Sequence, residues 1–174
     1  MEDFCKIIDK MPRPYPLEYG KFLYNEVIKH SPMICYEFGS SWGFTTYAIA
    51  KALKDQGKGK LYSYDHKVQR VQKANNILKQ LNLNDVCEVE FKDIFSITSF
   101  GLDFDFLYID ICNDGQKIQE VLNKIKYKNK LIYFEGGSNE RNKVCLERNV
   151  PTFSNLKYEV IFGENQKHSF SKLI

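Results

Sequence analysis

The sequence lacks a strong excess of charge of either sign. Its 25 Lys and Arg residues stand against 22 Asp and Glu, which leaves a formal net charge of only +3. The lysines are interspersed with acidic residues and form no single basic block. A surface of this kind has no concentrated positive charge that would bind a polyanion, so we expect no nucleic-acid partner.

The sequence also lacks the features of membrane and exported proteins. No apolar run approaches the roughly 18 residues needed to cross a bilayer, and the acidic residues after Met1 are not the start of a signal peptide. The five cysteines, at positions 5, 35, 87, 112 and 145, form no CxxC pair. A scattered, odd set of thiols is typical of a reducing compartment. We therefore expect a cytoplasmic protein without a membrane partner.

What is present is an alternation of amphipathic and apolar segments over 174 residues, a length that suits one domain. Three prolines predict an N-terminal extended segment over residues 1–16, because proline fixes φ and biases its predecessor away from helix. Residues 17–174 are expected to form a single domain. Apolar residues at helical spacing predict helices within it at residues 17–29, 43–54, 68–81, 115–125 and 138–148.

Short apolar runs between these segments predict strands at residues 33–38, 60–64, 86–91, 104–109 and 130–134. Strands that alternate with helices form a parallel sheet covered on both faces. Two further runs, at residues 158–162 and 169–173, flank a turn-rich stretch and predict a hairpin. The predicted fold class is α/β: a Rossmann-like, doubly wound, mostly parallel seven-stranded sheet with a C-terminal antiparallel hairpin.

An acidic residue stands at or just beyond the end of each predicted parallel strand: Glu37, Asp65, Asp93, Asp110 and Glu135. Ligands of open α/β sheets bind beyond the carboxyl ends of the strands. These five carboxylates would form an acidic rim there. Such a rim suits a cationic ligand that carries hydroxyl or amino donors.

A glycine turn, Glu37-Phe38-Gly39-Ser40-Ser41-Trp42-Gly43, follows the first strand. Gly39 permits close backbone approach to a ligand, and the helix that follows presents free N–H groups that can hold a carboxylate. Asp65 follows the turn by about 20 residues, a spacing that suits ribose hydroxyls. Capping of the next helix is the alternative role for Asp65, and Asp93 is either an adenine-binding acid or an ordinary loop aspartate.

This combination resembles the class I S-adenosylmethionine-dependent methyltransferases. Glu37-x-Gly39-x-x-x-Gly43 matches the first motif of that family, Asp65 and Asp93 match its second-strand and adenine-contacting acids, and Phe106-Leu107-Tyr108-Ile109-Asp110 matches its fourth-strand motif. The resemblance covers about residues 20–174. It implies S-adenosylmethionine as cofactor, held by Glu37, Phe38, Gly39, Ser40, Ser41, Gly43, Thr45, Asp65, His66, Asp93, Ile94 and Asp110.

Within this class the chain is similar to small-molecule and glycan O-methyltransferases. Those proteins often carry Asp-Gly-Asp-His after the fourth strand and a second acid after the fifth. Here Asp110 begins the first stretch, Asn113 replaces its histidine and Glu135 provides the second acid. The resemblance implies that Asp110 and Glu135 are catalytic, and these two carboxylates could also bind Mg²⁺ through oxygen. Arg141 and His168 are expected to lie exposed, with anion binding as the alternative for Arg141.

The predicted function is methyl transfer to a hydroxyl of a small polar acceptor, such as a sugar or a natural-product-like molecule. The enzyme would act mainly by positioning donor and acceptor. Two alternatives stay open: a catalytically silent S-adenosylmethionine-binding module, and an NAD-dependent oxidoreductase, whose G-x-G spacing the turn lacks. The apolar edge of the hairpin could pair with a second copy and give a homodimer.

Overall fold

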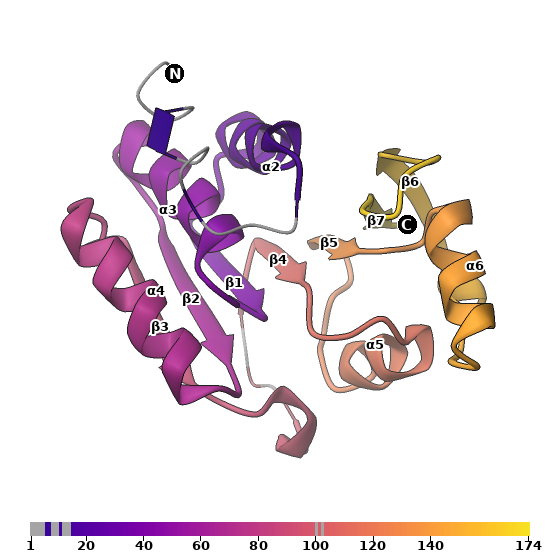
Figure 1. Ribbon diagram of the computed structural model, residues 1–174. Helices are drawn as coiled ribbons and strands as arrows, with labels where there is room; N and C mark the ends of the chain where they lie inside the picture. Colours follow the sequence, from indigo (N-terminus) through magenta and orange to yellow (C-terminus); the bar gives the residue numbers. More distant parts are fainter. Residues whose placement is uncertain (1–5, 8–10, 12–14, 100, 102) are drawn as a thin grey trace.

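The computed structural model describes residues 6, 7, 11, 15–99, 101 and 103–174. Most of the N-terminal segment predicted over residues 1–16 therefore lies outside the described residues, as does Cys5. The described chain forms one seven-stranded sheet with helices packed against it (Figure 1). Within that part of the chain, no helix has both the length and the apolar character needed to cross a membrane.

The sheet has the strand order β3-β2-β1-β4-β5-β7-β6. Its strands are β1 (Ile34–Phe38), β2 (Lys60–Asp65), β3 (Cys87–Phe91), β4 (Phe106–Ile109), β5 (Leu131–Glu135), β6 (Tyr158–Phe162) and β7 (Phe170–Leu173). Strands β1 to β5 are parallel, whereas β7 runs antiparallel to both of its neighbours. The predicted Rossmann-like sheet and its C-terminal hairpin are confirmed.

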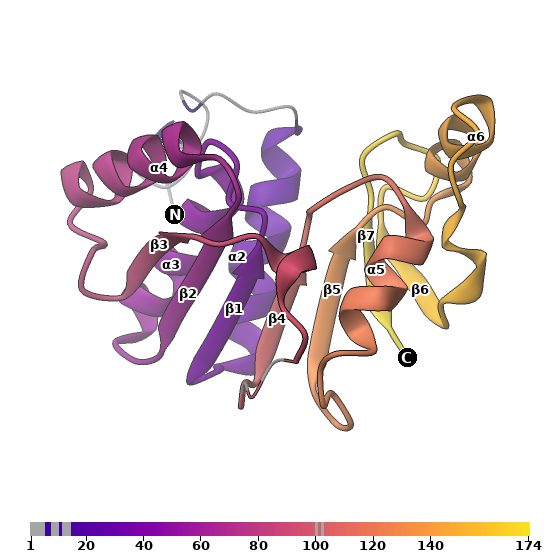
Figure 2. The same cartoon turned by 90° about the horizontal axis from the view of Figure 1, so that it is seen from below.

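Two hydrophobic clusters hold helices against opposite faces of the sheet. The helices are α2 (Leu17–His30), α3 (Phe44–Gln56), α4 (Val68–Gln80), α5 (Gly115–Leu122) and α6 (Asn139–Glu147), with short 3-10 turns η1 (Ile94–Ser96) and η2 (Phe153–Asn155). Residues of α2, α3 and α4 join one cluster, and residues of α5, η1, η2 and α6 join the other. Figure 2 shows α5 and η1 in front of the sheet, with α2 and α3 behind it.

The strand order reverses between β1 and β4. The chain adds β2 and β3 on one side of β1, then crosses back and adds β4 and β5 on the other. Phe38 is paired with Tyr64 on one side and with Ile109 on the other, so the carboxyl ends of β1, β2 and β4 meet. A topological switch point of this kind is where open α/β sheets bind ligands.

Gly39 allows the loops beyond β1 and β4 to approach closely. Its φ of +99° lies in the left-handed region, and a Cβ at this position would lie 2.1 Å from the carbonyl oxygen of Asp110. No side chain fits at that distance. Position 39 therefore requires glycine for both its backbone conformation and its packing.

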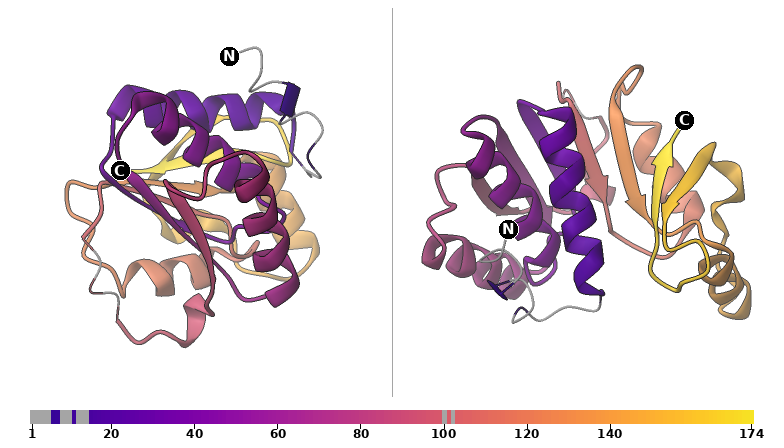
Figure 3. Two further views of the ribbon diagram at one scale, coloured as in Figure 1. Left: turned by 90° about the vertical axis from the view of Figure 1, so that its left-hand side faces the viewer. Right: turned by 90° about the horizontal axis from the view of Figure 1, so that it is seen from above.

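The C-terminal hairpin places β7 between β5 and β6 (Figure 3). Because β7 is antiparallel to β5, Phe170 at the start of β7 pairs with Glu135 at the end of β5. The residues just before β7 consequently lie beside the carboxyl ends of the parallel strands. Two segments that are distant in sequence meet at this corner of the sheet.

Candidate active site

A first cavity lies at the switch point, beyond the ends of β1, β2, β3 and β4. Six of its lining residues were predicted to contact the cofactor: Gly39, Asp65, His66, Asp93, Ile94 and Asp110. Its other lining residues are Tyr64, Arg70, Lys92, Phe95 and Ile111. The structure thus brings together residues from four separate strand ends.

The carboxylate of Asp65 is buried and held in place at the edge of this cavity. It accepts hydrogen bonds of 2.9 Å from the backbone N–H groups of Ser41 and Lys67, and a guanidinium nitrogen of Arg70 lies 3.7 Å away. A carboxylate has about four acceptor positions, so further donors can still be bound. The residue preceding α4 is Lys67, and no side chain caps that helix. The structure therefore gives no support to the capping role considered for Asp65.

The start of α3 has no side-chain cap. Gly43 precedes the helix with a φ of +88°, no side chain caps it, and its first turn contains no acidic residue. The first N–H groups of such a helix have no partner within the helix. The hydroxyl of Ser40 is also buried without a hydrogen-bond partner among the described residues. A ligand carboxylate would suit these donors.

Glu37 is fully buried beneath this loop and does not line the first cavity. Its carboxylate accepts hydrogen bonds of 2.5 Å from the hydroxyls of Thr45, Thr46 and Ser63. Burial raises the pKa of Glu37 to about 7, although the three hydroxyl bonds act in the opposite direction. Phe38 packs in the hydrophobic cluster on the α5 face. Glu37 therefore stabilises the loop from beneath. As a member of the predicted acidic rim it was expected at the ligand surface instead.

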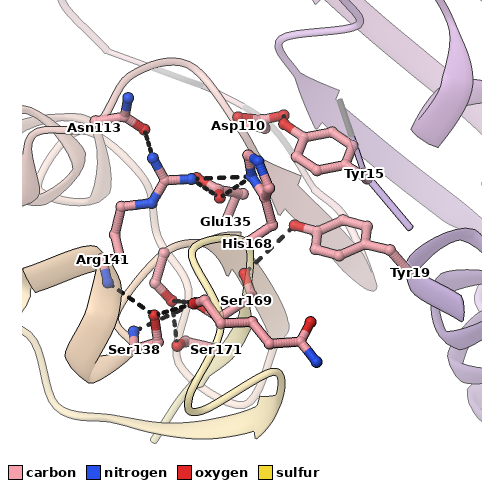
Figure 4. Close-up of polar contacts among 12 residues, drawn as sticks. Tyr15, Tyr19, Asp110, Asn113, Glu135, Ser138, Arg141, His168, Ser169 and Ser171 are labelled. Atoms are coloured by element: carbon pink, nitrogen blue, oxygen red, sulfur yellow. Dashed lines mark hydrogen bonds and ion pairs between the residues drawn. The ribbon is translucent and has the colours of Figure 1, made fainter. Parts of the chain in front are cut away.

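A second cavity adjoins the first, and Figure 4 shows several of its lining residues. The two share Arg70, Asp110 and Ile111. The remaining lining residues come from the segment before α2, the loops after β1 and β4, the end of β5, helix α6 and the hairpin: Tyr15, Ser41, Cys112, Asn113, Glu135, Arg141 and His168. Molecules bound in the two cavities would meet beside Asp110.

Both carboxylates predicted to be catalytic already have partners in the second cavity. Asp110 accepts a hydrogen bond from the hydroxyl of Tyr15, and Glu135 forms an ion pair with Arg141. Glu135 also lies 3.2 Å from Nδ1 of His168. Burial and repulsion by Glu135 raise the pKa of Asp110 to about 7. The two acids therefore interact electrostatically, each held by its own partner.

This donor set does not fit the predicted magnesium site. Mg²⁺ requires near-ideal octahedral coordination by oxygen atoms, whereas an oxygen of Glu135 is bound to a guanidinium group. Among the described residues, no group of three or more His, Cys, Asp or Glu side chains could hold a metal ion. The prediction that Asp110 and Glu135 chelate Mg²⁺ is not supported, because Arg141 supplies the positive charge there.

The prediction that Arg141 is exposed is wrong. The residue is 3% exposed, and its guanidinium group donates to Asn113 at 2.9 Å and also contacts Glu135 and His168. The start of α6 lies at the carboxyl edge of the sheet because Ser138, three residues after β5, caps the helix. The side chain of His168 is 25% exposed and lines the second cavity.

Comparison with known proteins agrees with this geometry. Residues 36–130 match a family model described as a methyltransferase domain. No curated protein matches the sequence. The fold is similar to that of an O-methyltransferase from Bacillus cereus solved with S-adenosylhomocysteine, with a TM-score of 0.70 at 18% identity over 98% of this chain and 88% of that one.

Two further solved structures share the fold. A methyltransferase from Podospora anserina, also bound to S-adenosylhomocysteine, gives a TM-score of 0.70 at 11% identity and covers 98% of this chain and 86% of its own. The O-methyltransferase TomG from Streptomyces achromogenes, involved in tomaymycin synthesis and solved with S-adenosylmethionine, gives 0.63 at 14% identity, covering 92% and 81%. At these identities the likeness establishes the fold.

Proposed function

The chain belongs to a family of methyltransferase domains, and from this premise we propose that it transfers the methyl group of S-adenosylmethionine to a hydroxyl of a small polar acceptor. One observation carries the proposal: two adjoining cavities share Arg70, Asp110 and Ile111. The first would hold the methyl donor and the second the acceptor.

The first cavity and the loop after β1 have the groups that the donor requires. Asp65 would accept the ribose hydroxyls, and its orientation is fixed in advance by the N–H groups of Ser41 and Lys67. The uncapped start of α3 and the unpartnered Ser40 hydroxyl would bind the methionine carboxylate. Asp93 lines the same cavity and would accept from the adenine amino group. Its own carboxylate also caps η1 through the N–H of Phe95.

The second cavity favours an acceptor rich in hydroxyl groups. Its walls carry two carboxylates, two guanidinium groups, an amide and an imidazole, with few apolar side chains among them. Such groups donate to and accept from hydroxyls, and they would leave a flat hydrocarbon ring without suitable contacts. A sugar or a similarly polar small molecule therefore suits this cavity better than an apolar one.

The reaction would depend mainly on position. S-adenosylmethionine supplies a methyl group already activated by its sulfonium centre. The chain would contribute alignment of the acceptor oxygen with that carbon, which can provide about 7–11 kcal/mol of the barrier reduction.

Thermal unfolding with S-adenosylhomocysteine tests the donor site. At 100 times its Kd the ligand should add about 2.7 kcal/mol of stability, which corresponds to roughly 5–10 °C in Tm for a domain of this size. Asp65→Asn should remove most of the shift, whereas Glu88→Gln, the same chemical change at an exposed residue of β3, should retain it. Absence of a shift in the wild-type protein would contradict the proposal.

Acceptor turnover tests the second half of the proposal. Radiolabelled S-adenosylmethionine would be incubated with a panel of monosaccharides, glycosides and catechols, and methylated products would be identified by mass spectrometry. Transfer to a sugar or glycoside hydroxyl is expected. Binding of S-adenosylhomocysteine without turnover on any member of the panel would favour the silent binding module, and a Tm shift with NAD⁺ alone would favour the oxidoreductase.

A further inference from the structure

His168 brings an imidazole ring from the C-terminal hairpin into the second cavity. It lies between β6 and β7, and the antiparallel pairing of Glu135 with Phe170 brings it to the end of β5. Its Nδ1 atom is 3.2 Å from a carboxylate oxygen of Glu135. The same ring lines the cavity together with Tyr15 and Asp110, and Figure 4 shows it between Glu135 on one side and those two residues on the other.

We infer that His168 is the catalytic base: Glu135 holds its Nδ1–H, and its Nε2 takes the proton of the acceptor hydroxyl. The inference rests on the proposed function and adds a residue to its site. It also gives Glu135 a positioning role, instead of direct contact with the acceptor. A histidine held in this way by a buried carboxylate is a general arrangement for proton transfer.

The tautomer follows from the contacts of Glu135. A nitrogen of Arg141 lies 3.2 Å from Nδ1 of His168, but the same nitrogen also forms an ion pair with Glu135. A charged carboxylate is a much stronger acceptor than a neutral imidazole nitrogen. Arg141 donates to Glu135. Because an ionised carboxylate can only accept, the 3.2 Å contact between Glu135 and Nδ1 of His168 is a hydrogen bond when Nδ1 is the donor. This leaves Nε2 as the unprotonated nitrogen.

Cys112 and Tyr15, two other ionisable groups of the cavity, are less suited to this step. Burial raises the pKa of the Cys112 thiol to about 11, and burial together with Asp110 and Glu135 raises the pKa of the Tyr15 hydroxyl above its usual range. Asp110 accepts the Tyr15 hydroxyl.

The proton and electron balance is simple. The acceptor O–H bond breaks and its proton moves to Nε2 of His168. An oxygen lone pair forms the new O–CH₃ bond, and the carbon–sulfur bond breaks with its electron pair remaining on sulfur. The products are a methyl ether and neutral S-adenosylhomocysteine. The imidazolium then returns its proton to water through the exposed part of the cavity.

Nitrogen NMR on the protein alone tests the tautomer. The sequence contains only three histidines, so long-range ¹H–¹⁵N spectra of ¹⁵N-histidine-labelled protein would show three ring systems, assigned with His168→Gln and His30→Gln. At pH 8 we expect His168 to carry its proton on Nδ1. A proton on Nε2 would overturn the inference. This readout is independent of whether S-adenosylhomocysteine binds, so failure of the donor proposal would be recognised separately.

Kinetics with the acceptor identified in the panel test the role. His168→Gln should lower kcat roughly 100- to 10,000-fold with the KM for S-adenosylmethionine unchanged, and the remaining activity should rise steadily with pH. His30→Gln, the same change on the remote helix α2, should behave like the wild type. A kcat of the His168→Gln variant within about threefold of the wild-type value would refute the role. A large loss of kcat in Asp110→Asn but not in His168→Gln would refute it as well.

Discussion

Glu37 shows how a single buried carboxylate can make stability depend on pH. Its pKa is raised from 4.5 to about 7 in the folded protein, so the native state binds this proton more tightly than the unfolded chain does. The stabilisation from the protonated form is complete below about pH 4.5 and is lost as the pH rises through 7. Between pH 5 and 8 we expect the free energy of unfolding to fall by roughly 3 kcal/mol from this residue.

Urea unfolding at several pH values measures this effect, with Glu37→Gln as the comparison. The variant cannot titrate at position 37, so its stability should fall less steeply over the same range. Equal slopes for the variant and the wild type would show that Glu37 does not titrate there. A difference that grows towards low pH in favour of the variant would reverse the expected sign.

Arg141 and Glu135 give a second prediction for single residues. Both side chains are almost completely buried, and removal of one partner leaves the other charge without compensation. Arg141→Met should therefore cost roughly 3–5 kcal/mol of stability. The double variant Arg141→Met/Glu135→Gln removes both charges, so urea unfolding should show it to be more stable than Arg141→Met alone. Additive losses would contradict a direct pairing.

The residues that could be predicted from the sequence are those fixed by local spacing. Gly39, Asp65 and Asp110 each follow a buried strand, and the ends of parallel neighbours meet at one edge of the sheet. Arg141 and His168 could not be placed in the same way. Arg141 depends on the capping of α6 by Ser138 directly after β5. The position of His168 depends on β7 lying beside β5, a pairing between residues more than thirty positions apart. The predicted hairpin contained the necessary signal, because an antiparallel β7 must start where β5 ends.

At the scale of elements, the strands and helices were mostly found close to their predicted positions because their apolar periods are regular. The connection from β3 to β4 is the least regular, and the structure forms only the short turn η1 in its described part. Asp93 caps that turn through the N–H of Phe95. Its role in binding adenine stays a prediction that the capping bond does not exclude.

The contact between the loops after β1 and β4 can be tested through Gly39. Gly39→Ala would combine a strained φ with a Cβ placed 2.1 Å from Asp110, at a total cost of at least about 3 kcal/mol. Gly57 also has a positive φ, but nothing lies within 4 Å of a Cβ there. Gly57→Ala should therefore cost only about 1 kcal/mol. Equal losses in thermal unfolding would show that the close contact is unimportant.

At the scale of the whole molecule, strand order determines where the chemistry can occur. Five parallel strands direct their carboxyl ends to one edge, and the antiparallel β7 adds the start of a strand to the same edge. Both cavities therefore form at this edge of the sheet. The two hydrophobic clusters cover the opposite faces of the sheet. Association through the hairpin edge stays a prediction. Ile161 of β6 is 37% exposed there, and sedimentation at several concentrations would measure any dimer.

Trp42 gives the molecule an optical reporter of its own. It is the only tryptophan in the sequence, it lies in the loop between Ser41 and Gly43, and the ammonium group of Lys73 is 4.8 Å from the centre of its ring. Its indole is 38% exposed, so a change in the loop would alter the polarity and quenching around the ring. Emission excited selectively in tryptophan thus arises from this loop alone, and a fluorescence titration could follow its movements without any label.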